Sequence, residues 1–184
     1  MERFSPNART DRYGSRLHRG HSSVLATVIP WASIMLASVL PLFFITAALP
    51  VVPPLAYLLM IAWRIVRPGL FPLWAGLPLG AFDDLFSGQP MGSGILLFSL
   101  TMIAFELLET RFPWRSFAQD WVTAALFVIG YILMAAIFSG AVLTPNLLIA
   151  IVPQIVLSIL AFPILARLAA ALDRLRLLRW MAVR

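Results

Sequence analysis

The stretch "GHSSVLATVIPWASIMLASVLPLFFITAALPVVPPLAYLLMIAW", residues 20–63, runs for 44 residues without a formal charge. A transmembrane helix needs about 20 apolar residues, so this stretch is long enough to cross a bilayer twice. The segment "LPVVPP", residues 49–54, supplies the break, because proline lacks a backbone donor and disfavours helix in the residue before it. The stretch therefore predicts two membrane helices, at residues 24–48 and 51–66.

The composition of the whole chain is also typical of a membrane protein. Hydrophobic residues make up 61% of the 184, whereas soluble domains average about 45–50% apolar residues. All 14 basic residues are arginines that flank the apolar runs, so the net charge of +6 indicates membrane topology and no nucleic-acid partner. Cysteine is absent, which excludes disulfides, thiolate nucleophiles and cysteine-based metal sites.

Four more helices follow from the remaining uncharged runs. Asp83 and Asp84 fit a third membrane helix only near its far end, because at about 1.5 Å per residue Asp84 lies roughly 24 Å beyond Pro68. That depth is close to the opposite interface of a ~30 Å hydrocarbon core. The sequence thus predicts an all-α integral membrane protein with six transmembrane helices, the last four at residues 68–87, 91–108, 118–138 and 145–167.

The positions of the arginines favour this arrangement. Five lie in the N-terminal tail, two after the second helix, two after the fourth, and five at or after the end of the sixth. All then fall on one side of the membrane, which the positive-inside rule assigns to the cytoplasm. We expect both termini there, with a disordered basic tail at residues 1–23, the transmembrane domain at 24–167, and a basic juxtamembrane extension at 168–184 that meets membrane lipid.

The polar residues predict no catalytic, cofactor or metal site. Adjacent positions on a helix point about 100° apart, so Asp83 and Asp84 cannot both face one pocket squarely. Three interpretations of the pair stay open: a helix end in contact with water, a packing or partner site, and transport or catalysis. His18 and His21 both lie in the tail, so Ser93 has no intramembrane histidine and is interpreted as a small residue in a helix-start turn.

Other residues predict helix packing. Gly76 and Gly80 in "GLPLG" form a small-xxx-small face, for which packing within the chain is favoured over an intermolecular interface. Gln154 and Ser158 lie one turn apart on the sixth helix and are expected to form interhelical hydrogen bonds. Surface pairing is expected among the charges after the fourth helix: Glu106, Glu109, Arg111 and Arg115.

The segment "LGAFDDLFSGQPMGSGILLFSLTMIAFELLETRFPW", residues 79–114, resembles the rod shape-determining protein MreD family of bacterial inner membranes. Pro163 followed by Arg167 is also similar to the family's closing pattern. Ser158 departs from it, because family members often carry asparagine there. The positions that match the family's motif are Gly80, Asp84, Leu85, Ser87, Gly88, Pro90 and Gly92.

The resemblance implies a non-enzymatic, multi-pass subunit of the peptidoglycan-synthesising cell-elongation machinery, without a cofactor. Its implied partner is the single-span protein MreC, and through it actin-like MreB, the polymerase RodA and a penicillin-binding transpeptidase. The matched residues would then form a partner-binding or structural motif, with Asp84 as the family carboxylate and Asp83 as a solvated neighbour near the outer face. A homo-oligomer is left open.

One alternative comes from another functional class. The MreD family looks similar in architecture to the substrate-binding subunits of energy-coupling-factor vitamin transporters. A subunit of that kind predicts a small-molecule pocket among the helices and a docking face for an ATPase-linked partner.

Overall fold

The computed structural model describes residues 23–44, 52–111, 116–142 and 144–176. Within these ranges the chain is helical and has no strand, which confirms the all-α prediction. The helices are α1 (Ser23–Phe44), α2 (Leu55–Val66), a 3₁₀ turn η1 (Leu73–Ala75), α3 (Gly76–Ser87), α4 (Ser93–Arg111), α5 (Phe117–Phe138) and α6 (Pro145–Arg176).

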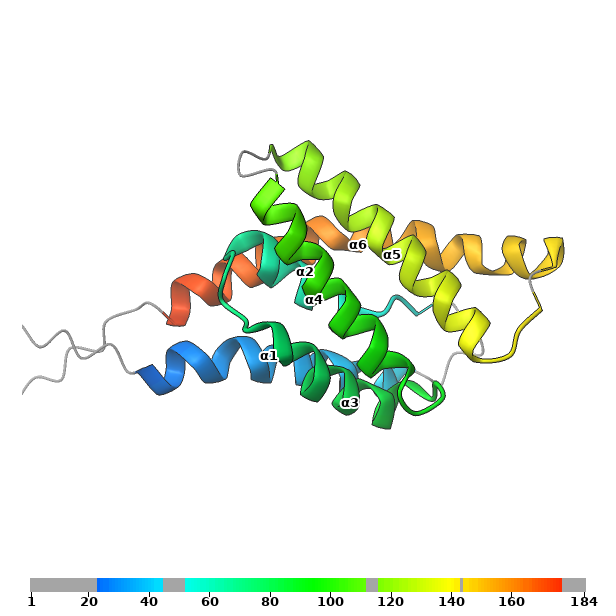
Figure 1. The fold of residues 1–184 in the computed structure, drawn as a ribbon, viewed down its shortest axis with the longest axis horizontal. Coiled ribbons are helices and arrows are strands. Elements are labelled where there is room, and N and C mark those ends of the chain that lie inside the picture. The colour runs from blue at the N-terminus through cyan, green and yellow to red at the C-terminus, as the bar shows by residue number, and fades with distance from the viewer. Residues whose placement is uncertain (1–22, 45–51, 112–115, 143, 177–184) are drawn as a thin grey trace, which may run out of the picture.

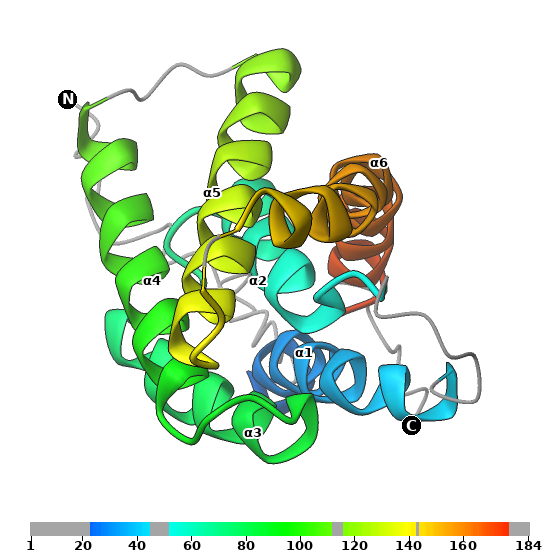
Figure 2. The ribbon, with the colours of Figure 1, turned by 90° about the vertical axis from the view of Figure 1, so that its right-hand side faces the viewer.

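The centre of the bundle is α2. All nine residues from Ala56 to Arg64 are buried, as expected for a helix that is hydrophobic on every side. It packs against α1, α5 and α6, while α3 packs against α1 and α4. Figures 1 and 2 show this arrangement, with α4 and α5 diverging from each other in Figure 2.

The length of α2 and α3 departs from the sequence expectation. The helix predicted at residues 68–87 begins only at Gly76, after a turn that contains Pro68 and Pro72, and the one predicted at 51–66 begins at Leu55. In each case prolines hold the preceding backbone out of the helical conformation. Twelve residues extend for about 18 Å, so α3 is too short to cross a ~30 Å core.

Three helices meet the length and hydropathy needed to cross a membrane: α4, α5 and α6. Residues 27–43 of α1 and the whole of α2 form shorter apolar helices. The chain therefore has six α-helices within the described residues, of which three are candidate spans by themselves. The helix lengths therefore identify three candidate spans, whereas the sequence predicted six crossings.

Both ends of the helical part lie at one end of the molecule, because α1 begins and α6 ends on the same side in Figure 1. We call this the terminal end and the opposite one, with the α3–α4 turn, the far end. At the terminal end α6 continues beyond residue 167 to Arg176, whose guanidinium lies 5.6 Å from the Trp63 ring centroid. Residues 1–22 of the tail predicted at 1–23, and residues 177–184 of the extension predicted at 168–184, lie outside the described residues.

Candidate functional site

The Asp84 carboxylate caps the N-terminus of α4. Oδ1 accepts a hydrogen bond from the Gly94 N–H at 2.7 Å, and Oδ2 accepts from Gly92 at 2.8 Å and Ile95 at 3.3 Å. The first N–H groups of a helix lack partners inside it and carry partial positive charge. Asp84 is 4% exposed and satisfies these donors, so a side chain of α3 fixes where α4 begins.

Two glycines bring the backbone of α3 against α4. A Cβ on Gly80 would lie 2.5 Å from the Gly94 carbonyl oxygen, and a Cβ on Gly76 would lie 2.7 Å from the Ser99 Cα. Both neighbours are backbone atoms, so no larger residue fits at either position without moving a helix. The small-xxx-small face is therefore occupied within the chain.

The turn between α3 and α4 uses backbone conformations that favour glycine. Gly88 ends α3 with φ 69°, and Gly92 precedes α4 with φ 98°. Ser93 is 7% exposed, and its hydroxyl donates to the Pro90 carbonyl at 2.7 Å, which fits a small residue in a helix-start turn. The other residues that match the family motif are exposed: Leu85 and Ser87 at the end of α3, and Pro90 in the turn.

Asp83 faces the inside of the bundle. Tyr131 of α5 donates its hydroxyl to Asp83 Oδ2 at 3.4 Å, and Gln89 donates to the Tyr131 oxygen at 3.3 Å. The Ser38 hydroxyl of α1 also lies near Asp83, and it donates to the Ile34 carbonyl of its own helix at 3.4 Å. Asp83 is only 7% exposed, so the prediction that it is solvated is wrong. Its rotation of about 100° from Asp84 turns it towards α1 and α5, which cover it.

A cavity of about 340 Å³ lies at the far end, between α1, α2, α3, α5 and α6. Ser87 and Ser139 line it and are exposed, so the cavity reaches the surface. Much of its wall is aliphatic, with Phe86 as an aromatic neighbour. The polar side chains along it are Ser38, Asp83, Ser87, Gln89, Tyr131, Ser139 and Gln154.

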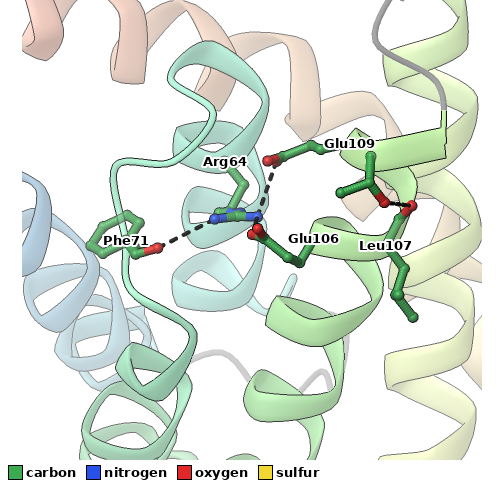
Figure 3. Close-up of polar contacts among 6 residues, drawn as sticks. Arg64, Phe71, Glu106, Leu107 and Glu109 are labelled. Carbon is green, nitrogen blue, oxygen red and sulfur yellow. Dashed lines mark hydrogen bonds and ion pairs between the residues drawn. The ribbon is translucent and has the colours of Figure 1, made fainter.

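Arg64, near the C-terminus of α2, is a buried charge that the sequence did not reveal. It is 1% exposed, and its Nη2 lies 3.1 Å from Glu106 Oε2 and 3.1 Å from Glu109 Oε1. Nη1 donates to the Phe71 carbonyl at 3.3 Å. Figure 3 shows both glutamates reaching the guanidinium from α4. The three charges join α2 to α4 near the terminal end.

These ion pairs correct the sequence interpretation of α4. The two glutamates were expected to pair at the surface with Arg111 and Arg115, of which Arg115 lies outside the described residues. Glu106 and Glu109 are three positions apart and so share one face of a helix. That spacing was a usable signal that both could meet one cation, although it does not say which arginine.

Gln154 and Ser158 differ in what they bind. Gln154 donates its side-chain amide to the Val52 carbonyl at 3.0 Å, which ties α6 to the segment before α2. Ser158 is fully buried, but its hydroxyl donates to the Gln154 carbonyl of its own helix at 2.6 Å. A serine can satisfy itself in this way four residues back along a helix.

A groove of about 510 Å³ separates α4 from α5, where the two helices diverge (Figure 2). In its wall the Tyr57 and Thr101 hydroxyls bond to each other at 2.7 Å. Gly130 of α5 is exposed, and a Cβ there would have no neighbour within 4 Å. The rest of the wall is mainly apolar: Leu97, Leu100, Ala104, Leu126, Phe127 and Met134, with Tyr131.

Within the described residues no group of three or more histidine, aspartate or glutamate side chains could hold a metal ion.

Comparison with known proteins gives one match. A family model described as rod shape-determining protein MreD matches residues 22–173. No curated protein and no solved structure matches the chain.

Proposed function

The chain belongs to the rod shape-determining protein MreD family, and on this basis we propose that it is a non-enzymatic membrane scaffold that docks a single-span MreC-like partner. Family membership gives the chain a role in rod-shape determination, and its apolar helices are able to span a membrane. The proposal adds the bacterial inner membrane and the peptidoglycan-synthesising elongation complex. In that complex the partner would link the chain to MreB, RodA and a penicillin-binding transpeptidase.

The observation that carries the proposal is the groove between α4 and α5. A glycine in a helix interior costs roughly 1 kcal/mol relative to alanine, and Gly76, Gly80 and Gly94 offset this cost by close packing inside the chain. Gly130 has no such neighbour. In membranes, small residues at a helix surface let a second helix approach closely. An apolar groove with an open glycine therefore fits a partner's transmembrane helix.

The proposed docking surface is therefore separate from the residues that match the family motif. The glycines of α3 and the Asp84 carboxylate are engaged by α4. Substituting them would disturb the fold itself, so loss of a partner in such variants would not locate an interface. Residues of the groove give a cleaner test.

The experiment introduces Gly130→Leu, which fills the groove from α5. We expect loss of co-purification with an MreC-like protein and loss of rod shape, while the purified variant keeps its helical content. Ala118→Leu is the matched control, because Ala118 is exposed on the same helix but does not line the groove. Wild-type levels of co-purification in Gly130→Leu would contradict the proposal. Loss of self-association alone would assign the groove to a homo-oligomer instead.

One observation favours the transporter alternative: the cavity of about 340 Å³ has a volume within the range of small-molecule pockets. A substrate-binding subunit is expected to unfold at higher temperature when its vitamin is present. Thermal unfolding of the purified chain with a panel of vitamins tests this directly. A clear rise with one vitamin, together with an intact partner complex in Gly130→Leu, would favour the transporter function.

A further inference from the structure

We propose that the far-end cavity is a binding site for a cationic group, an ammonium or a guanidinium, that pairs with Asp83. The inference does not depend on the scaffold function, because the cavity and the α4–α5 groove are separate features that share only the Tyr131 side chain. It rests on the contacts of Asp83 and on the charges around the cavity.

The negative charges of Asp83 and Asp84 are offset to different degrees by their neighbours. Asp84 accepts three backbone hydrogen bonds at the positive end of α4. Asp83 has two neutral hydroxyl neighbours, Tyr131 at 3.4 Å and Ser38. A desolvated carboxylate is costly unless a charge or strong donors offset it. Asp83 lines a space large enough to admit a positively charged group.

The chain itself supplies no cation to this site within the described residues. None of the described residues that line the cavity is basic. Lysine is absent from the sequence, and its described arginines lie at positions 64, 67, 111, 167, 174 and 176. Those with described ion pairs to acidic side chains meet Glu106, Glu109 or Asp173, not Asp83. No described residue therefore places a positive charge beside Asp83, and the cavity leaves room for a ligand to do so.

The size and the lining of the cavity define the ligand further. Small-molecule pockets span about 300–1,000 Å³, so this one holds a small amine or a single basic side chain. Tyr131 and Phe86 provide aromatic surface, which also attracts cations. The Gln89, Ser139 and Gln154 side chains can bond polar atoms of the same ligand. The cation can be free or can belong to a polypeptide that reaches the far end.

The test measures binding to the full chain in lipid nanodiscs by calorimetry and thermal unfolding. One probe is phenethylamine, compared with uncharged 2-phenylethanol. The other is acetyl-Gly-Arg-Gly-amide, compared with the same peptide carrying citrulline, which has nearly the same shape but no charge. We expect a cation to bind and its uncharged counterpart to bind at least about tenfold more weakly. Binding of the amine alone indicates a free ligand, and binding of the arginine peptide indicates a polypeptide source.

Variants tie this binding to the cavity. Asp83→Asn is expected to weaken binding of the cation at least about tenfold. Ala135→Leu, which narrows the cavity and leaves Asp83 in place, is expected to weaken it as well. Asp120→Asn is the control, since it removes the same charge from the N-terminal turn of α5. The inference is overturned if neither cation binds, if the uncharged analogues bind equally well, or if Asp83→Asn binds the cation as wild type does.

Discussion

At the scale of single residues, Asp83 and Asp84 show how a rotation of about 100° separates two identical side chains. Asp84 meets the N-terminus of α4 and serves as a cap that comes from another helix. Asp83 meets Tyr131 and the cavity. Asp84 therefore stabilises the fold, and Asp83 is the carboxylate that we propose binds a ligand.

Asp84→Asn tests the capping role. The amide keeps one acceptor oxygen but loses the negative charge at the positive end of α4, so we expect the free energy of unfolding to fall by about 1–3 kcal/mol. Thermal unfolding in detergent, followed by circular dichroism, measures the change. Asp83→Asn provides the comparison, because it removes a poorly compensated charge and should leave the unfolding temperature unchanged or higher. The capping role is wrong if Asp84→Asn unfolds at the wild-type temperature.

Alanine substitutions at two glycines are expected to change the stability of the chain in opposite directions. Gly80→Ala places a methyl group 2.5–2.7 Å from the backbone of Gly94 and Ile95, and overpacking of this kind costs about 1–3 kcal/mol. Gly130→Ala meets no neighbour within 4 Å and should stabilise the isolated chain by up to about 1 kcal/mol through helix propensity. Chemical denaturation of both purified variants checks this. Shifts of the same sign would contradict the packing described for α3.

At the scale of elements, α2 is buried on every side and carries Arg64 within it. The guanidinium is 1% exposed, whereas the Glu106 and Glu109 side chains are 48% and 20% exposed. The cost of breaking this cluster therefore depends on which charge is left behind. A stranded carboxylate on α4 can still reach water, but a stranded guanidinium cannot.

We expect the double variant Glu106→Gln/Glu109→Gln to lose more stability than Arg64→Met. The double variant strands a buried positive charge, which costs about 3–5 kcal/mol. Methionine instead fills the space of the Arg64 stem with an apolar side chain, and such replacements are often close to neutral. Unfolding in detergent at one ionic strength compares the two. Equal losses would mean that the buried charge is not what the glutamates stabilise.

The sequence predicted some helices much better than others, for physical reasons. The start of α5 is encoded locally, because Ser116 accepts from the Gln119 N–H in a capping box; the predicted start at residue 118 differs by one position from Phe117. The predicted start of α3 was wrong by eight residues. The uncharged run has the apolar composition of a membrane span, but Pro68 and Pro72 prevent it from forming a continuous helix.

The side-chain contacts of the site were harder to predict from the sequence than the helices were. The sequence pattern of an arginine at the end of an apolar run is the same whether the arginine faces the cytoplasm or is buried against carboxylates of another helix. Glu106 is 42 residues from Arg64, so no local pattern links them. The capping role of Asp84 likewise depends on how close Gly80 brings α3 to α4, which the spacing of the glycines indicates but does not fix.

At the scale of the whole molecule, the two ends of the helical part lie on one side (Figure 1). The six predicted crossings would give the same arrangement. The side on which they lie is a prediction from the arginines. The absence of cysteine from the sequence makes a direct test possible.

Single-cysteine variants labelled with a membrane-impermeant maleimide should report this topology. Val142→Cys, at a position 78% exposed beyond the end of α5, is expected to react in intact spheroplasts. Thr110→Cys, exposed at the C-terminal end of α4, should react only after permeabilisation. Because both positions are exposed, the difference reports the side of the membrane and not burial. The reverse pattern would place the termini outside.

The burial of Arg64 also has a consequence for biosynthesis. During translation α2 leaves the ribosome before the chain has reached Glu106, 42 residues later. A twelve-residue helix with an unpaired arginine is a poor substrate for lipid insertion. The two ion pairs that hold Arg64 in the folded chain can therefore form only after α4 has been made. A chain that ends before α4 lacks both carboxylates that meet the Arg64 guanidinium.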